Sequence, residues 1–300
     1  MNSEEHRCGL VAVVGAPNAG KSTLVNALVG QKVAIVSPKA QTTRTRLLGV
    51  AIEGETQVLL VDTPGIFEPR RRLDRAMVAA AWEGAEGADL IALVVDGKGG
   101  VGPKVAAIAE RVANRPEPKH LVLNKVDVAD KARLLAHAER LHAITPFAET
   151  WFVSAQTGDG LPELKRALAG AMPPGPWHYP EDQVSDATER ALAAEVTREQ
   201  LYLQLHAELP YASAVETEAF KERADGSVEI HQQILVERPT QRAIVLGKGG
   251  QQIKQIGARA RAELIRLLDR PVHLYLHVKV RPGWDEDRDV YRDIGLDWVE

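Results

Sequence analysis

The stretch Leu10–Ser22 reads LVAVVGAPNAGKS and joins an apolar run to a glycine-rich loop. The run Leu10–Val14 is short and bounded by glycine, which is typical of a buried parallel strand. Gly15–Ser22 then matches the pattern G-x-x-x-x-G-K-[ST] ahead of a helical pattern. In this pattern backbone N–H groups surround a nucleotide β-phosphate, the lysine (Lys21) reaches the β- and γ-oxygens, and the serine hydroxyl (Ser22) binds Mg²⁺. The stretch therefore predicts a strand, a phosphate-binding loop and a helix.

Residues 9–172 continue this alternation of strands and helices. Between the apolar runs lie stretches rich in Ala, Leu and Arg that have helical length. Strands separated by helices of about 10–15 residues are typical of an α/β fold with a mainly parallel sheet. Gly54, between two acidic residues, predicts the turn of one hairpin. The further predicted strands are Leu47–Ile52, Thr56–Val61, Leu90–Val95, His120–Leu123 and Thr150–Val153.

The composition is that of a folded protein with room for two domains. The chain has 300 residues, of which 45% are hydrophobic and 26% charged, and a usual domain has about 150 residues. Its apolar runs are far shorter than the roughly 20 residues of a membrane span, and the polar, acidic start Met1–His6 fits neither a signal nor a transit peptide. A single cysteine, Cys8, excludes an internal disulfide and argues against a cysteine-based metal cluster. We therefore expect a soluble protein of a reducing compartment.

The pattern changes after the first half of the chain. Residues 173–185 are rich in proline, which continues neither a helix nor a central strand, so they predict a linker. Asp186–Ala207 and residues 253–268 have helical spacing, whereas residues 228–236 and Val272–Val280 alternate as half-buried strands. The order helix, strand, strand, helices, strand predicts a small α+β domain. The predicted organisation is a first domain over residues 1–172, a linker over 173–185, a second domain over 186–284 and a charged tail over 285–300 of undecided helical content.

Three short motifs at the ends of predicted strands favour GTP over ATP. The DTPG motif Asp62–Gly65 offers a carboxylate that can hold Mg²⁺ through water and a glycine N–H that can meet the γ-phosphate. The NKVD motif Asn124–Asp127 ends in a carboxylate that can accept hydrogen bonds from guanine N1–H and N2–H₂, a pair of donors that adenine lacks. In Ser154-Ala155 a backbone N–H can meet guanine O6. Each motif is weak alone, but all of them in this order after the phosphate loop predict a guanine-nucleotide site.

These motifs make residues 9–172 resemble a translation-factor-class GTPase, and specifically the Era family. The resemblance implies that Gln41–Arg44 is the first switch, where one threonine closes over Mg²⁺ in the GTP state. Thr43 is favoured over Thr42, and in a plainer interpretation both threonines only cap a loop. The resemblance implies catalytic roles for Lys21, Thr43 and Gly65, and Mg²⁺ ligation by Ser22, Thr43 and Asp62. It implies nucleotide contacts from Gly15, Ala16, Pro17, Asn18, Ala19, Gly20, Lys21, Ser22, Thr23, Asp62, Gly65, Asn124, Lys125, Asp127, Ser154 and Ala155.

Two residues bear on how GTP would be hydrolysed. Ile66 follows the DTPG motif and has no hydrogen-bonding group where small GTPases use a glutamine to orient water, so we expect slow unaided hydrolysis. Asn18 lies in the phosphate loop, and in relatives of this subfamily an asparagine there is associated with a bound K⁺ that acts where an arginine finger would. A carboxamide oxygen can coordinate K⁺, and a cation bridging the phosphates would offset developing charge. The alternative is that Asn18 only stabilises the loop.

The second domain holds a basic segment with a glycine loop. Residues 238–281 carry ten Lys or Arg against two acidic residues, which indicates a surface facing a polyanion or, alternatively, a solvated helix face. Within it Gly247–Gly250 fits G-x-x-G, a loop that lets the backbone of a single strand come close while apolar neighbours face the bases. Together with the order of elements, this loop resembles that of a type II KH domain. In the alternative interpretation the glycines only end a helix, in an interaction domain that does not bind RNA. The resemblance implies RNA binding by Arg242, Gly247, Lys248, Gly249, Gly250, Lys254 and Arg259.

A P-loop GTPase domain, a proline-rich linker and one KH domain resemble the Era arrangement over nearly the whole chain. The resemblance implies a slow, Mg²⁺-dependent GTPase that binds single-stranded 16S ribosomal RNA near its 3′ end and acts in maturation of the small ribosomal subunit. It implies a cytoplasmic monomer, and peripheral association with the inner face of the cell membrane is compatible with it, although the sequence shows no anchor. The alternative is a membrane- or protein-responsive signalling switch in which the KH fold is mainly scaffolding. The basic residues around the glycine loop favour RNA binding.

Overall fold

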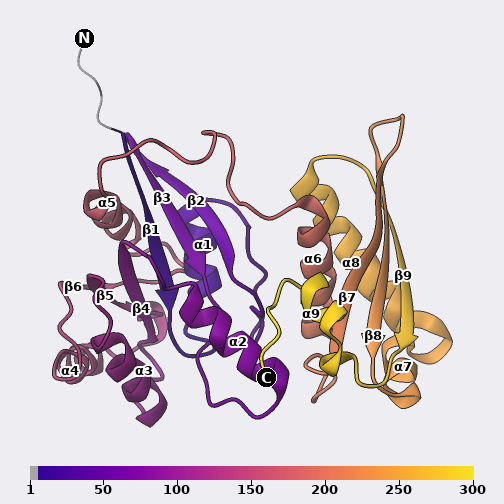
Figure 1. The fold of residues 1–300 in the computed structure, drawn as a ribbon, viewed down its shortest axis with the longest axis horizontal. Helices are drawn as coiled ribbons and strands as arrows, with labels where there is room; N and C mark the ends of the chain where they lie inside the picture. Colours follow the sequence, from indigo (N-terminus) through magenta and orange to yellow (C-terminus); the bar gives the residue numbers. More distant parts are fainter. Residues whose placement is uncertain (1–5) are drawn as a thin grey trace. The chain divides into compact units, whose positions relative to one another are not determined.

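The computed structural model describes residues 6–300, which divide into two compact units. The first unit is a sheet with helices on both of its faces, and the second is a smaller sheet with helices on one face (Figure 1). The α/β and α+β domains predicted from the sequence correspond to most of the first and second units respectively. The first unit comprises the residues up to Val36, Thr43–Arg70 and Met77–Asp186, and the second comprises Ser37–Thr42, Arg71–Ala76 and Ala187–Glu300.

The first unit is built on one sheet. Its strands are β1 (Arg7–Val14), β2 (Leu47–Glu53), β3 (Thr56–Asp62), β4 (Leu90–Asp96), β5 (Lys119–Asn124) and β6 (Glu149–Phe152). They lie in the order β2-β3-β1-β4-β5-β6, and β1 pairs in parallel with β3 on one side and with β4 on the other. β2 runs antiparallel to β3, which confirms the predicted hairpin. Parallel strands buried on both faces are continuous apolar runs, and this is why the sequence located them.

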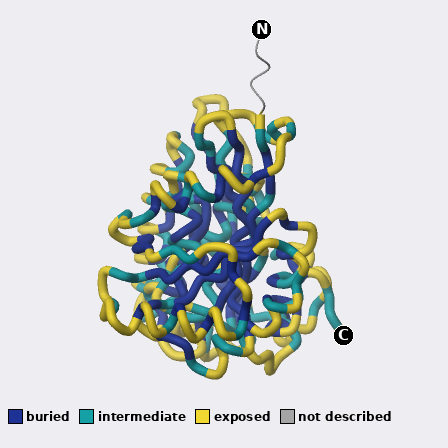
Figure 2. The backbone as a smooth tube through the Cα atoms, turned by 90° about the vertical axis from the view of Figure 1, so that its left-hand side faces the viewer, coloured by how far each residue is buried: buried dark blue, intermediate teal, exposed yellow. Residues whose placement is uncertain are grey.

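Helices cover both faces of this sheet because successive strand residues point to opposite sides. They are α1 (Lys21–Val29), α2 (Arg72–Glu83), α3 (Pro103–Ala113), α4 (Lys131–His142) and α5 (Leu161–Ala171). On one face Val11 of β1 packs in a cluster with Leu24 of α1, and on the other face Ala12 lies in a cluster with Ile108 of α3. Figure 2 shows the buried backbone of this unit in its interior. The α/β fold class predicted from the sequence is confirmed.

The proline-rich segment is bound to the first unit along part of its length. The backbone N–H of Cys8 donates to the Pro173 carbonyl at 3.2 Å, and the N–H of Val50 donates to the Val184 carbonyl at 2.8 Å. Between these points Trp177 and Tyr179 pack against a small buried cluster on β1, β2 and β3. Proline prevents this segment from becoming a regular strand, yet its carbonyl groups still accept hydrogen bonds from the sheet. The segment predicted as a linker is therefore attached to the first unit and is not a free tether.

The second unit has a three-stranded sheet in the order β7-β8-β9. Its elements are α6 (Glu189–Gln204), β7 (Ser213–Glu222), β8 (Val228–Val236), α7 (Pro239–Leu246), the 3₁₀ turn η2 (Lys248–Gly250), α8 (Gln251–Leu268) and β9 (Val272–Val280). β8 is antiparallel to β7 and parallel to β9, so α7 and α8 form the crossover between two parallel strands. The predicted α+β order is confirmed. Among the described residues 6–300, no helix is both long and apolar enough to cross a membrane.

The C-terminal residues are packed and partly helical. They form the 3₁₀ turn η3 (Trp284–Glu286) and the helix α9 (Arg288–Asp293), and they bury Trp284, Val290 and Tyr291. The indole N–H of Trp284 donates to the Ala212 carbonyl at 3.3 Å, which ties this segment to the start of β7. The charged tail predicted over 285–300 is thus a structured part of the second unit, in which Val290, Tyr291 and Leu296 are buried.

Leu264 and Ile265 are neighbours in α8 that differ in burial, and they provide a matched test of the second core. Leu264 is fully buried beside Ile230 and Val272, whereas Ile265 is 42% exposed. Leu264→Ala leaves a cavity, so we expect the free energy of unfolding to fall by about 2–5 kcal/mol. Ile265→Ala should lower it by less than about 1 kcal/mol. Urea denaturation followed by circular dichroism measures both, and equal losses would contradict this packing.

Candidate nucleotide-binding and RNA-binding sites

The phosphate loop lies between β1 and α1 and needs glycine at both of its ends. Gly15 has φ +154°, and a Cβ there would lie 2.3 Å from the carbonyl oxygen of Val94 in β4. Gly20 has φ +91°, and a Cβ there would lie 2.3 Å from the side-chain nitrogen of Asn124. Both separations are far inside van der Waals contact, so any larger residue would push the loop away from its neighbours. The glycines of the motif therefore allow the loop to lie against β4 and β5.

Lys21 is buried at the start of α1. Its ammonium group donates to the carbonyl oxygens of Gly15 at 3.2 Å and Ala16 at 3.0 Å. Burial lowers the pKa of Lys21 to about 8, and the carboxylate of Asp62 only partly opposes this shift. The amine is therefore held under the loop in a place where an anion would favour its charged form.

Three oxygen-bearing side chains converge beside Lys21. The hydroxyl of Ser22 lies 2.6 Å from Asp62 Oδ2 and 2.8 Å from Thr43 Oγ1, and Thr43 Oγ1 lies 3.3 Å from Asp62 Oδ2. Asp62 Oδ1 is buried and has no hydrogen-bond partner among the described residues. Burial raises the pKa of Asp62 to about 6, although hydrogen bonds from Ser22 and Thr43 and the charge of Lys21 act in the opposite direction. Two hydroxyls and a carboxylate, one of whose oxygens is buried without a hydrogen-bond partner in the described part of the chain, fit a hard divalent cation such as Mg²⁺.

The two adjacent threonines have different surroundings. Thr43 faces Ser22 and Asp62, whereas the hydroxyl of Thr42 lies 2.7 Å from Ser37 Oγ and donates to the Lys39 carbonyl at 2.8 Å. Thr42 thus closes a local loop, which is the plainer role that the sequence allowed for both residues. Of the two threonines, only Thr43 lies beside Ser22 and Asp62.

The DTPG loop packs directly on the phosphate loop. A Cβ at Gly65 would lie 2.8 Å from Pro17 Cα, so only glycine permits this approach. The backbone N–H of Ile66 donates to the Gly15 carbonyl at 3.0 Å, and the Ile66 side chain is buried among apolar residues. The position that follows the motif therefore supplies no side-chain group that could orient water.

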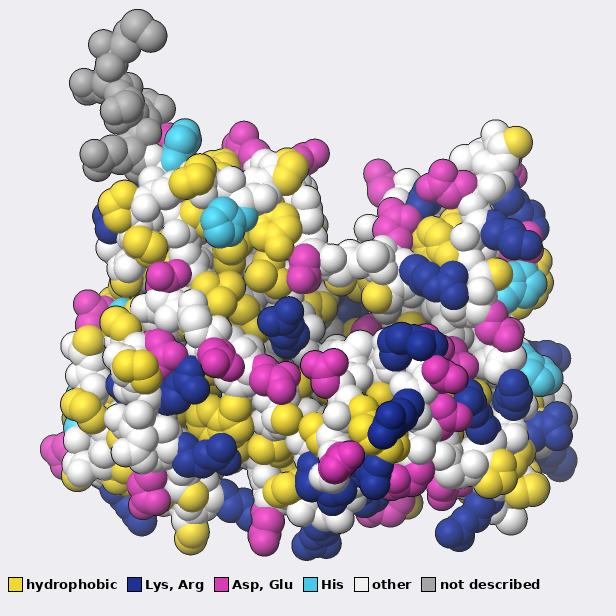
Figure 3. Space-filling view, viewed as in Figure 1, with side chains coloured by type: hydrophobic (Ala, Val, Ile, Leu, Met, Phe, Trp, Pro, Cys, Tyr) yellow, Lys and Arg dark blue, Asp and Glu magenta, His cyan; other side chains and the backbone are white. Residues whose placement is uncertain are grey.

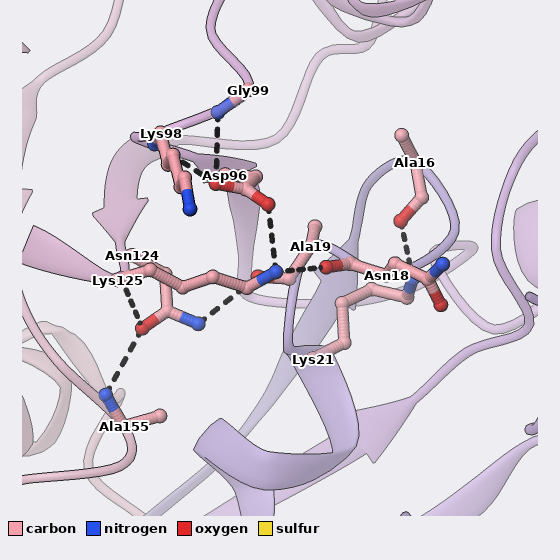
Figure 4. A network of polar contacts seen from close by, with 10 residues as sticks. All are labelled: Ala16, Asn18, Ala19, Lys21, Asp96, Lys98, Gly99, Asn124, Lys125 and Ala155. Carbon is pink, nitrogen blue, oxygen red and sulfur yellow. Dashed lines mark hydrogen bonds and ion pairs between the residues drawn. The ribbon is translucent and has the colours of Figure 1, made fainter. Parts of the chain in front are cut away.

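Asn124 ties the guanine motif to the phosphate loop (Figure 4). Its side-chain nitrogen donates to the Ala19 carbonyl at 3.0 Å, and its side-chain oxygen accepts from the backbone N–H groups of Lys125 at 2.8 Å and Ala155 at 3.0 Å. Asp127 is exposed in the 3₁₀ turn η1 (Val126–Val128) that follows β5.

Ser154 and Ala155 follow β6 at this edge, where the sequence predicts a backbone N–H that meets guanine O6. The N–H of Ser154 donates to the Asp159 carbonyl at 2.9 Å, and that of Ala155 donates to Asn124 at 3.0 Å. Both donors already have protein acceptors in this structure. Ser154 and Ala155 therefore hold Asn124 and the loop after β6 in place.

Asp96 is a site residue that sequence reasoning missed. Its carboxylate lies 2.7 Å from the ammonium group of Lys125, at the end of β4. The sequence did contain a signal for Asp96. It is the single polar residue of an otherwise apolar strand and stands at its end, just as Asp62 and Asn124 stand at the ends of β3 and β5. Parallel strands end at the same edge of a sheet, so polar residues at such ends gather there.

The glycine loop of the second unit lies between α7 and α8. Gly247, Gly249 and Gly250 have φ of +69°, +59° and +76°, a backbone region that favours glycine. A Cβ at Gly247 would lie 2.6 Å from the Cβ of Gln252, so this glycine also serves close packing. Arg242, Lys248, Lys254 and Arg259 are all exposed. In Figure 3, Lys and Arg side chains gather toward the lower right, over the part of the second unit where Figure 1 places α7. The structure thus brings the predicted RNA-binding residues to one loop and the two helices beside it.

Two family models match parts of the chain. The model described as a 50S ribosome-binding GTPase matches residues 10–125, and a KH domain model matches residues 208–285. The first match contains the phosphate loop and the DTPG motif, and the second contains the glycine loop.

Similar proteins match the chain over its whole length. GTPase Era of Erythrobacter litoralis is 62% identical over 303 residues, covering 100% of both chains, and GTPase Era of a Bradyrhizobium strain is 55% identical over 99% of both. A structure of an Aquifex aeolicus Era variant with GDP and AlF₄⁻ is 38% identical, covers 96% of this chain and 99% of its own, and has a TM-score of 0.91. A structure of Era with MgGDPNP and nucleotides 1506–1542 of 16S ribosomal RNA is also 38% identical, covers 97% and 99%, and has a TM-score of 0.92.

The geometry of both sites and this similarity over the whole chain agree with the resemblance found in the sequence. The chain therefore belongs to the Era family of GTPases, in which a GTPase domain is followed by a KH domain.

Proposed function

We propose that this GTPase binds Mg²⁺–GTP in its first unit and single-stranded 16S ribosomal RNA near the 3′ end in its KH domain, and acts in assembly of the small ribosomal subunit. The observation that carries the proposal is the presence of both sites in one chain that is similar from end to end to an Era bound to MgGDPNP and a 16S ribosomal RNA segment. The basic, glycine-containing loop supplies the chemistry for RNA, since unpaired bases and a close backbone are what such loops recognise.

The nucleotide site would work mainly by positioning and charge. In the proposal Ser22, Thr43 and Asp62 hold Mg²⁺, which when bound neutralises charge on the phosphates. Lys21 faces the β- and γ-phosphates, and the Gly65 N–H meets the γ-phosphate. Because Ile66 is buried and apolar, hydrolysis without a partner should be slow. The bound AlF₄⁻ of the Aquifex relative supports a phosphoryl-transfer site of this kind.

Asp127 tests the guanine assignment. Asp127→Asn keeps an acceptor oxygen but adds an amide donor, which opposes the donors of guanine and suits the extra carbonyl of xanthine. We expect GTP affinity to fall about 30- to 150-fold, as for the loss of a charge-assisted pair worth about 2–3 kcal/mol, and xanthosine triphosphate to bind instead. Asp130→Asn, at the N-cap of α4, is the matched control and should change neither affinity. Fluorescent-nucleotide titration measures both, and unchanged GTP binding in Asp127→Asn would refute the assignment.

Asn18 tests a proposed potassium site. Its side chain is exposed in the phosphate loop and can therefore reach a cation beside the phosphates. Its backbone carbonyl accepts a hydrogen bond from Lys125. We expect GTP hydrolysis to be about tenfold faster in KCl than in NaCl of equal ionic strength, or ~1.4 kcal/mol of transition-state stabilisation. Asn18→Ala should abolish the difference in rate between the two salts. Asn114 is the C-cap of α3, away from the phosphate loop, and Asn114→Ala should keep the difference. Equal rates in the two salts would leave Asn18 with a role in the loop alone.

The glycine loop tests RNA binding. Gly249→Asp places a negative charge where a phosphate backbone would pass. The positive φ strains any residue but glycine there, but a Cβ at Gly249 meets nothing within 4 Å, and Asp is among the residues that best tolerate this region. We expect affinity for a single-stranded oligonucleotide of the 16S 3′ end to fall about tenfold or more, with a weaker dependence on salt. Gly226→Asp is the control, because Gly226 also has positive φ (+80°) and open space, in the turn between β7 and β8. If the wild type bound no RNA, or if both variants bound equally, the interpretation as a protein- or membrane-responsive switch would replace this one.

A further inference from the structure

Lys125 forms a bridge between two loops of the nucleotide site. Its ammonium group donates to the backbone carbonyl of Asn18 in the phosphate loop at 2.6 Å and to Asp96 Oδ2 at 2.7 Å. Figure 4 shows the Lys125 side chain reaching toward the phosphate loop, with dashed lines from its nitrogen to Asn18 on one side and to Asp96 above it. A lysine ammonium is a point charge on a flexible stem, so without a fixed anion it would sample many positions.

Asp96 is itself held rigidly. Its Oδ1 accepts from the backbone N–H groups of Lys98 at 2.9 Å and Gly99 at 3.0 Å, in the turn after β4. The other carboxylate oxygen is thereby directed at Lys125. Burial on its own raises the pKa of Asp96, but the hydrogen bond and charge of Lys125 and the two backbone donors outweigh it, and the pKa is lowered. The carboxylate is therefore charged at neutral pH.

The bridge joins two residues with unfavourable backbone conformations. Asn18 has φ +63° and Lys125 has φ +66°, and non-glycine residues rarely adopt this left-handed region. Such residues persist where the surrounding structure holds them, and they gather at functional sites. Here the ammonium group of Lys125, one of the two strained residues, bonds to the backbone carbonyl of Asn18, the other.

We infer that Asp96 is a positioning residue of the nucleotide site. It fixes the Lys125 ammonium group on the Asn18 carbonyl and so holds the phosphate loop against the NKVD motif, Asn124–Asp127. Asp96 touches no nucleotide in this role. It keeps the two loops at the spacing at which one nucleotide can contact both. The loops are then ordered before the nucleotide binds, and binding does not have to order them. The inference rests on the proposed nucleotide site, and it does not depend on K⁺ at Asn18.

A simpler role for Asp96 would be to hold only its own turn, and two substitutions separate the roles. Asp96→Asn retains an oxygen for the N–H groups of Lys98 and Gly99 but removes the charge that holds Lys125. Asp96→Ala removes both. If Asp96 only stabilised the turn, Asp96→Asn would behave as the wild type and only Asp96→Ala would be impaired. If it positions Lys125, both variants should be impaired.

The experiment is the dissociation of a fluorescent GDP analogue from the full-length protein, chased with excess GDP. We expect Asp96→Asn to speed dissociation about 5- to 20-fold, which is a charge-assisted hydrogen bond discounted for the one-third exposure of both side chains. Asp130→Asn is the matched control. The Asp130 carboxylate, like that of Asp96, accepts from a local backbone N–H, but no lysine among the described residues bonds to it, so the nucleotide should dissociate from this variant as it does from the wild type. KM for GTP should rise while kcat at saturating GTP stays within about twofold, because the bridge is the same in the ground and transition states.

A double-mutant cycle with Lys125→Met decides whether Asp96 acts through the lysine. In the Lys125→Met background, Asp96→Asn should change dissociation by less than about twofold, since the group that it positions is gone. Unchanged dissociation in Asp96→Asn alone, or effects of the two substitutions that simply multiply, would overturn the inference. Failure of the wild type to retain the GDP analogue would instead refute the proposed nucleotide site. Thermal unfolding of each variant shows that the comparison is made on folded protein.

Discussion

The parallel pairing of β1 with β3 and β4 is the constraint on which the nucleotide site depends. It brings the carboxyl ends of neighbouring strands to one edge, where Gly15, Asp62 and Asp96 follow or close β1, β3 and β4. Backbone N–H and C=O groups in this ladder are buried and must remain paired, so the strand ends cannot shift independently. The loops that leave this edge therefore start from fixed points, and single side chains such as Asn124 and Lys125 are enough to connect them.

Within that frame the site keeps opposite charges buried. Lys21 and Asp62 are both buried and act on each other through their charges, and their pKa values move toward each other, to about 8 and about 6. Each group is in a less favourable state than it would be in solution, because burial disfavours both charges. An anion near Lys21 or a cation near Asp62 would favour the charged form of that group. Binding affinity can thus come from charges the fold has already placed, without further ordering of the loops.

The second unit reaches its function differently. Its glycine loop carries no buried charge, and its basic side chains are exposed on the loop and on the helices beside it. The core beneath, where α6 and α8 cover one face of a three-stranded sheet, keeps the two helices flanking the loop in place. Exposed charges act on a polyanion through long-range attraction that salt weakens, whereas the loop itself allows close approach of a backbone. Affinity and fit are therefore supplied by different residues.

The sequence by itself determined the strands of the first unit, the phosphate loop and the glycine loop, because each depends on local features: apolar runs, glycines with positive φ and fixed spacing. It located most of the α+β domain from strict alternation in β8 and β9, but it did not locate β7, whose alternation is interrupted by a bulge between Thr217 and Ala219. It also treated residues 285–300 as a tail, since three buried residues among many charges carry no clear period.

Only the tertiary structure decided which side chains meet. The sequence favoured Thr43 over Thr42 but left the choice open, because adjacent residues share the same local pattern; in the structure Thr43 contacts Ser22, whereas Thr42 contacts Ser37. It predicted a backbone N–H of Ser154-Ala155 near the base, but it did not show that the N–H of Ala155 donates to the Asn124 side chain. It passed over Asp96, whose partner Lys125 directly follows β5, the next strand of the sheet. Contacts of this kind join residues far apart in the chain, and they exist only once the sheet has brought the strand ends to one edge.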